Sequence, residues 1–225
     1  MPDSDQSHPI LGPMAGAVPA GGVASLIRIP IPGTDNLAIE LSPRNYGGKS
    51  TSTLFLQDPA GKRLLRLDYG WNPKTKAVDF HWNQKGTFAD FGIADHTPAG
   101  GFGEALYRGA RAFKYLGRTL VVVGVALDVV SIVTASNPLL RTSEVAFGWA
   151  GAAAGGEAGG ALGAEGGTFA EPGLGTAIGG LAGGIVGGII GYWAGEKVGD
   201  FFYWSADTVF TRLPQTALPP QANGS

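Results

Sequence analysis

Residues 25–103 alternate apolar and polar side chains, a pattern typical of half-buried β-strands. The alternation is clear in the stretches ASLIRIPIPG, NLAIELS and AVDFHWNQ. Asp-Pro-Ala-Gly at 58–61 predicts a turn between two further strands, and WNPKTK predicts a second turn. FADFGIADH, residues 88–96, is expected to add a short strand. The pattern therefore predicts an antiparallel meander of about five or six strands.

From Glu104 onward, apolar residues recur with helical spacing instead. Three helices are expected, over 104–135, 146–168 and 174–203, with breaks at Asn137-Pro138 and Pro172-Gly173. The predicted fold class is α+β, an antiparallel β-rich meander followed by a Gly/Ala-rich α-helical hairpin region. The expected organisation is a disordered, mobile leader (1–24), a β-rich domain (25–103), a helical domain (104–212) and a disordered tail (213–225).

Both segments of the hairpin carry a row of glycines spaced by four residues, which a helix places on one face. Each glycine costs a helix interior roughly 1 kcal/mol relative to alanine, so the rows need a compensating gain. A face without side chains lets two helices approach closely, and in a bilayer small residues at this spacing are a preferred packing device. The predicted packing glycines are Gly151, Gly155, Gly159, Gly163 and Gly167 in the first segment and Gly175, Gly179, Gly183, Gly187, Gly191 and Gly195 in the second.

Residues 172–195 contain no charged side chain, over a length sufficient to cross about 30 Å of hydrocarbon. Because Gly and Ala are only weakly hydrophobic, the composition favours helices that stay shielded in water and insert later. Three acids, Asp128, Glu157 and Glu165, are costly at the centre of a bilayer and are candidate pore-lining residues. The two glutamates also favour the alternative, a soluble Gly/Ala hairpin packed against the β-rich part.

The chain has 225 residues, of which 44% are hydrophobic and only 15% charged, against a usual charged share of about 25%. Its net charge of −2 gives no electrostatic footprint for nucleic acid. Without cysteine, disulfides, thiolate metal sites and cysteine nucleophiles are excluded. The N-terminus lacks the basic and then apolar pattern of a signal peptide, so export is expected to use another route. Four cations precede the apolar part of the first helix and are candidate contacts for anionic lipid headgroups: Arg108, Arg111, Lys114 and Arg118.

Residues 79–98 concentrate polar and aromatic groups, including two of the three histidines in the chain. His81 or His96, with Lys85 or Arg66 as the cation and Asp95 nearby, offers the general base, general acid and cation that a metal-independent nuclease needs. The alternative is that His81 simply lies on a strand and His96 opens a turn before Pro98. No metal-ligand spacing, phosphate-binding loop or nucleophile motif accompanies these residues, so no metal and no cofactor are expected.

The blocks YGGKSTSTLFLQD, LRLDYGWNPKT, VDFHWNQKG and FGIADHTP, followed by YRGARAFKYLGRTLVVVGVALDVVSIVTA and the glycine rows, resemble the toxin parts of bacterial polymorphic toxins. The similarity is to type VI secretion and Rhs-associated effectors, and the part from about 115 to 195 is similar to their pore-forming modules. The resemblance implies secretion by a contractile injection machine without a signal peptide, and loading through a secretion-system spike or chaperone. It also implies a cognate immunity protein in the producing cell and action at the inner membrane of a target cell.

The leading hypothesis is therefore an antibacterial toxin, not an enzyme, that inserts its glycine-zipper helices and oligomerises with copies of itself in the target membrane. The resulting ion-permeable pore would dissipate the membrane potential. The alternative is a ribonuclease-type toxin that uses His81 and His96 while the helices serve translocation, and nucleic acid is a partner only in that case. A third hypothesis is a non-toxic membrane or envelope scaffold.

Overall fold

A computed structural model describes residues 19–43 and 51–212 of the chain. The first half forms one antiparallel sheet in the order β1-β2-β3-β4-β5-β6, so that every strand pairs with its neighbours in sequence. Three long helices follow, and the predicted α+β class and meander are confirmed. The strands are β1 (Ile29–Pro30), β2 (Ala38–Glu40), β3 (Leu54–Gln57), β4 (Leu64–Asn72), β5 (Ala77–Lys85) and β6 (Thr97–Pro98).

Both predicted turns are present. In the first, the Gly61 N–H donates to the Asp58 carbonyl at 3.0 Å, and Gly61 has a φ of 67°, a value that glycine adopts without strain. In the second, the Lys76 N–H donates to the Asn72 carbonyl at 2.8 Å. This tight connection joins the two longest strands, β4 and β5, which pair along their whole length.

The prediction of a strand over 88–96 is wrong. Phe88–Phe91 form a short helix, α2, and the last strand begins only at Thr97. Gly86 and Gly92, with φ of 68° and 66°, interrupt the extended backbone on both sides of this helix. The Arg63–Asp90 ion pair, at 2.5 Å, holds α2 against the start of β4.

The helices are α3 (Gly100–Thr134), α4 (Pro138–Ala170) and α5 (Leu174–Arg212). Asn137 caps α4 by accepting the Leu140 N–H at 3.1 Å, and Pro138 occupies its first turn, so the predicted break is confirmed. The helix expected from 146 begins at Pro138 because this cap fixes its start. The helix expected to end at 203 continues to Arg212, and Gly199 still packs on the Ser143 carbonyl.

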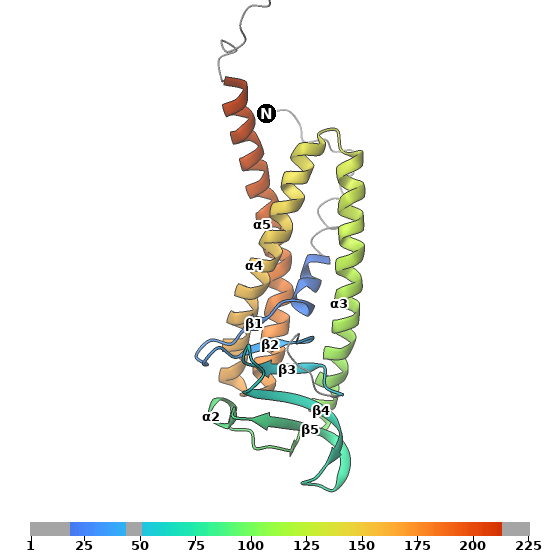
Figure 1. Cartoon of the computed structure of the whole chain (residues 1–225), viewed down its shortest axis with the longest axis vertical. Helices are drawn as coiled ribbons and strands as arrows, with labels where there is room; N and C mark the ends of the chain where they lie inside the picture. The colour runs from blue at the N-terminus through green and yellow to red at the C-terminus, as the bar shows by residue number, and fades with distance from the viewer. Residues whose placement is uncertain (1–18, 44–50, 213–225) are drawn as a thin grey trace, which may run out of the picture.

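The three helices run side by side, with α3 apart from the α4–α5 hairpin and the 3-10 helix η1 (Gly22–Ser25) between them, while the sheet lies across the lower part (Figure 1). The sheet and the helices share one apolar core, so the boundary predicted at 103 separates two zones of composition rather than two separate cores. The sheet contributes residues such as Ile29, Ile39, Leu56, Leu65 and Leu67, and the helices contribute Tyr107, Ala110, Ala164, Ala177 and Leu181.

Part of the predicted leader is packed inside the protein. The Pro-, Gly- and Ala-rich composition of residues 1–24 predicts a mobile leader, yet Ala20, Val23 and Ala24 are buried between the helices. These small residues fit against glycines of the helices, a tertiary contact that composition does not reveal. Residues 1–18 of the leader and the predicted tail, 213–225, lie outside the described residues.

Candidate functional site

The predicted glycine rows face each other along the antiparallel pair α4–α5, and we call this contact the zipper seam. An added Cβ at any of these glycines would overlap a backbone carbonyl oxygen of the other helix. The structure therefore brings the predicted glycines together within one chain, as an intramolecular hairpin. Gly151, Gly155, Gly159, Gly163 and Gly167 lie opposite Gly191, Gly187, Gly183, Gly179 and Gly175, respectively, and Gly195 lies against Phe147.

A second set of glycines on the same helices was missed by the sequence reasoning. These face the N-terminal segment and the sheet rather than the seam, and several are fully buried. The sequence contains a signal for this set, the Gly-Gly doublets such as 155–156 and 183–184. The first glycine of each doublet belongs to the seam, and the second leaves the neighbouring face of the helix without a side chain. The set comprises Gly156 and Gly160 of α4 and Gly180, Gly184 and Gly188 of α5.

The outer face of α3 is a large exposed apolar surface. Its most apolar window of 18 residues, about 27 Å long at 1.5 Å per residue, is only 17% buried. The core helix of a soluble protein is mostly buried, so that explanation does not fit α3. By length and composition, both α3 and α5 are suited to cross a membrane. The exposed side chains of α3 include Tyr115, Leu116, Val122, Val123, Val125, Leu127, Val129, Val130 and Val133.

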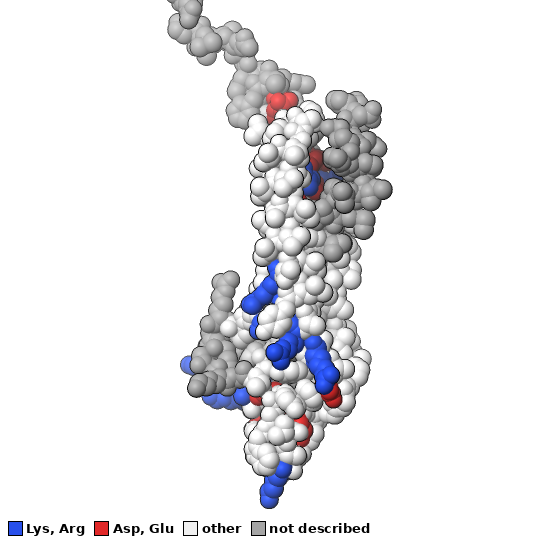
Figure 2. Space-filling model, turned by 90° about the vertical axis from the view of Figure 1, so that its right-hand side faces the viewer, with Lys and Arg blue, Asp and Glu red and all other residues white. Residues whose placement is uncertain are grey.

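The four predicted lipid-contacting cations lie on α3 just before this apolar surface. Figure 2 shows basic side chains over the lower part of the molecule and an uncharged region above them. Arg108 pairs with Glu104 at 2.6 Å and is 73% exposed, and Arg111 and Arg118 are also exposed. Partial burial, and then the neighbouring arginines, lower the pKa of Lys114. A cationic band beside an apolar face is the arrangement that an anionic membrane surface attracts.

Asp128, a predicted pore-lining residue, is buried in this structure where the three helices meet. Its carboxylate accepts a hydrogen bond from Trp149 Nε1 at 2.6 Å and one from the Tyr192 hydroxyl at 3.3 Å. The Arg141 guanidinium lies 3.6 Å away. A buried carboxylate requires such partners, so Asp128 joins α3 to the hairpin here, and its pore-lining role stays a prediction.

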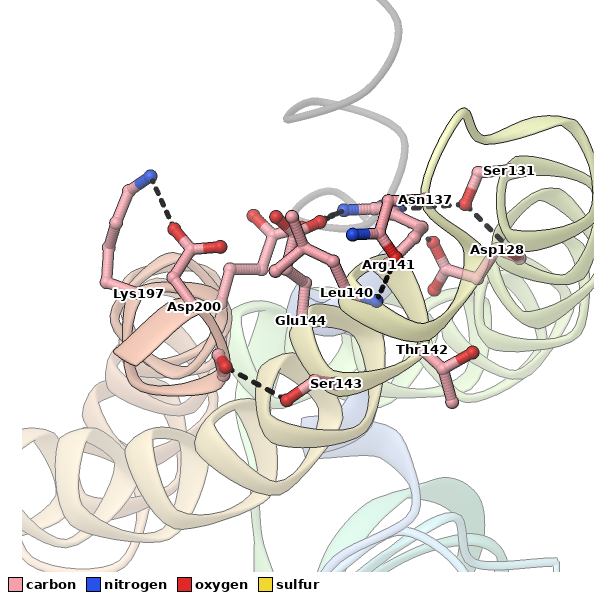
Figure 3. A network of polar contacts seen from close by, with 12 residues as sticks. Asp128, Ser131, Asn137, Leu140, Arg141, Thr142, Ser143, Glu144, Lys197 and Asp200 are labelled. Atoms are coloured by element: carbon pink, nitrogen blue, oxygen red, sulfur yellow. Dashed lines mark hydrogen bonds and ion pairs between the residues drawn. The ribbon is translucent and has the colours of Figure 1, made fainter. Parts of the chain in front are cut away.

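Arg141 is the centre of a polar cluster at this end of the bundle (Figure 3). Besides Asp128, its guanidinium contacts Glu144 at 2.9 Å and Glu196 at 2.8 Å, so carboxylates from all three helices share one cation. Burial, together with a hydrogen bond to Asp200, raises the pKa of Glu144 to about 7 against the lowering effect of Arg141. Burial likewise raises the pKa of Glu196.

This cluster was also missed by the sequence reasoning. Its signal is the position of Arg141, the last cation before a stretch that lacks any other until Lys197. The other two predicted pore-lining acids, Glu157 and Glu165, are exposed on α4. The three acids are therefore not gathered at one place in this conformation.

His81 and His96, the candidate nuclease residues, do lie together. Their rings stack with centroids 5.5 Å apart and planes 11° apart. The Nδ1 atom of each ring is close to a carboxylate oxygen, Asp79 Oδ1 at 2.9 Å and Asp95 Oδ2 at 2.8 Å, respectively. His81 is only 3% exposed, however, so substrate access to its ring is limited.

Lys85, one of the two candidate phosphate-binding cations, is not part of this group. It is exposed at the far end of β5, four residues beyond His81, which places it about 13 Å away along the strand. Among the described residues, no group of three or more histidines and carboxylates is arranged to hold a metal ion. The histidine pair therefore lacks Lys85. Arg66, the other candidate cation, lies on the neighbouring strand β4 and pairs with Asp68, the residue opposite His81, at 2.7 Å. Catalysis at this pair stays a prediction.

Comparisons with known proteins identify no relative of this chain. No family model matches the chain, and neither curated proteins nor solved structures give a match.

Proposed function

We propose that this protein acts on membranes, by inserting its apolar helices into a bilayer and making it permeable to ions. The exposed apolar face of α3 carries the proposal. Exposed apolar surface costs about 25 cal/mol per Å² in water, and large contiguous patches of it on soluble proteins are characteristic of membrane or protein contact. The length of the apolar window matches a hydrocarbon core better than it matches a small docking site.

Two further features support insertion. The cationic band beside the apolar face would hold α3 at an anionic surface before it enters. Asp128, the one charge in the apolar part of α3, already has hydrogen-bond partners on α4 and α5. A membrane-buried acid that keeps its partners within the bundle costs less than one exposed to lipid.

The resemblance to polymorphic toxins supplies the biological setting of this proposal. The protein would be an antibacterial effector, delivered by contractile injection through a spike or chaperone, that acts at the inner membrane of a target cell. It would form homo-oligomeric pores and be neutralised by a cognate immunity protein.

The test uses the full chain and vesicles containing phosphatidylglycerol, with a potassium gradient and a voltage-sensitive dye. A Val122→Lys, Val130→Lys variant places two charges on the exposed face of α3 without entering the core. Its matched control, Ala77→Lys with Ala89→Lys, adds the same charge at exposed positions of the sheet region. We expect the wild type and the control to dissipate the potential and the valine variant to lose that activity. A wild type that leaves the potential intact, or a folded valine variant with full activity, would overturn the proposal.

The stacked pair His81–His96, with a carboxylate at each Nδ1, favours the nuclease as a second candidate. It is tested in bacteria that express the chain, by following RNA and DNA integrity together with the membrane potential. A nuclease degrades nucleic acid before any depolarisation and loses toxicity in His81→Ala and His96→Ala. Depolarisation with intact nucleic acid, unchanged in both variants, would reject it.

A further inference from the structure

We call residues 19–31 the wedge. Their first part, with η1, lies between α3 and the hairpin, and the chain then continues across α4 into β1 (Figure 1). On the hairpin side the wedge covers four glycines of the second set: Gly156, Gly160, Gly184 and Gly188. A Cβ added at Gly184 would lie 3.0 Å from the Ala24 Cβ, and one added at Gly188 would lie 2.8 Å from the Ala20 carbonyl oxygen. The wedge thus fits a surface that consists largely of helix backbone.

The other side of the wedge meets glycines of α3. A Cβ added at Gly117 would lie 2.7 Å from the Ser25 hydroxyl oxygen, and one added at Gly124 would overlap the Pro19 ring. Gly117 and Gly124 are seven residues apart, which is about two helical turns, so they share one face. The wedge therefore separates two surfaces that are both suited to close helix packing.

Packing alone holds the front of the wedge in place. Among the described residues, no hydrogen bond or ion pair joins residues 19–27 to α3, α4 or α5. The Ser25 hydroxyl is buried and has no hydrogen-bond partner in the described part of the chain. An unpaired buried hydroxyl destabilises the seated wedge by about 1–3 kcal/mol. Because no polar interaction joins this contact, the two surfaces can separate without losing one.

The seated wedge is incompatible with insertion of α5. The part of α5 that it covers, around Gly184 and Gly188, lies inside the charge-free stretch that would cross the bilayer. The wedge continues into the sheet, where Arg28 pairs with Glu40 at 3.2 Å. A sheet edge and its charged residues are excluded from hydrocarbon.

We propose that the wedge is an autoinhibitory segment, an inference that rests on the membrane function proposed above. While it is seated, the hairpin stays in its water-exposed form with the second glycines covered. Its withdrawal, together with the sheet, uncovers those glycines as a helix-packing surface and is required before α5 enters the membrane.

Because the chain has no cysteine, a single engineered disulfide can lock the wedge. Ala24→Cys with Gly184→Cys is the first choice, since the 3.0 Å between the two Cβ positions needs only a small adjustment to reach disulfide geometry. Gly21→Cys with Ile189→Cys is a second, independent lock, because a Cβ at Gly21 would lie 3.1 Å from Ile189 Cγ1. The four single-cysteine variants are the matched controls.

The readout is depolarisation of the same vesicles, before and after reduction of a disulfide verified by mass. We expect the oxidised double variants to lose depolarising activity and reduction to restore it to the level of the single variants. The activity of the single variants should not change when the reductant is added. Equal activity of the oxidised and reduced forms in either locked variant would overturn the autoinhibitory role. A wild type without activity would instead reject the membrane function itself, so the two failures are distinguishable.

Discussion

Alanine substitutions at Gly159 and Gly166 should shift stability in opposite directions, although both residues lie in α4. A Cβ at Gly159 would overlap the Gly183 carbonyl oxygen and lie 2.9 Å from the Gly187 Cα. Both are backbone atoms of α5 that cannot rotate away, so the helices must move apart. A Cβ at Gly166 would meet no heavy atom within 4 Å.

The magnitudes follow from two opposing effects. Alanine is the better helix former by about 1 kcal/mol, so Gly166→Ala should raise the free energy of unfolding by about that amount. For a chain of this size the melting temperature should rise by about 2–4 °C. At Gly159 the same gain is outweighed, because separation of the helices loosens the neighbouring seam contacts as well. We expect Gly159→Ala to lower the free energy of unfolding by about 1–3 kcal/mol, the usual cost of overpacking.

Urea unfolding followed by far-ultraviolet circular dichroism measures both variants against the wild type. Gly183→Ala provides an internal check, because its Cβ would overlap the Gly159 carbonyl oxygen from the other side of the seam. It should therefore be destabilised like Gly159→Ala. If Gly159→Ala were instead stabilised as much as Gly166→Ala, the seam would not be close-packed in solution, and the reasoning about the glycine rows would be refuted.

The polar cluster around Arg141 gives three further predictions, each measured by urea unfolding. Arg141→Met leaves buried carboxylates without a cation and should cost about 3–5 kcal/mol, whereas Arg108→Met, at an exposed ion pair, should change stability by less than about 1 kcal/mol. Trp149→Phe removes a donor to the buried Asp128 and should cost about 1–3 kcal/mol. Folding raises the pKa of Glu144 from 4.5 to about 7, so the folded state binds the Glu144 proton more tightly than the unfolded state does. The resulting stabilisation is complete below about pH 4.5 and is lost as pH rises through about 7. Glu144→Gln should flatten this decline, and an unchanged pH profile would contradict the assignment.

The sequence was sufficient for the elements whose signals are local. Alternating apolar residues and two turn motifs predicted the meander, and Asn137-Pro138 predicted where α3 gives way to α4. The spacing of the glycines predicted which helix faces pack, because a helix converts a spacing of four residues into a face without any knowledge of the fold. One prediction from the local sequence was wrong. The strand expected over 88–96 is instead a short helix, flanked by Gly86 and Gly92, which both have a positive φ.

The features that required the fold are those set by tertiary contacts. The buried position of Asp128 depends on Trp149 and Tyr192, which approach it from the other two helices. Residues 19–23 carry no recognisable sequence pattern, and only the fold shows that they pack against glycines far away in the sequence. Likewise, Lys85 is close to His81 in sequence but not in space, because an extended strand rises about 3.3 Å per residue and so places residues four positions apart about 13 Å from each other.

The glycine rows by themselves do not decide between a soluble protein and a membrane protein. In this structure the seam, the wedge and the sheet already pack against both sets of glycines, so close packing offsets the helix cost in water as it would in lipid. A hairpin that served only as a soluble scaffold would need no further apolar surface. The exposed valines of α3 are the residues that such a scaffold leaves unexplained, because nothing in the described residues covers them. The distinction between the two functions therefore lies in α3, and substitutions there test the membrane function more directly than substitutions in the glycine rows.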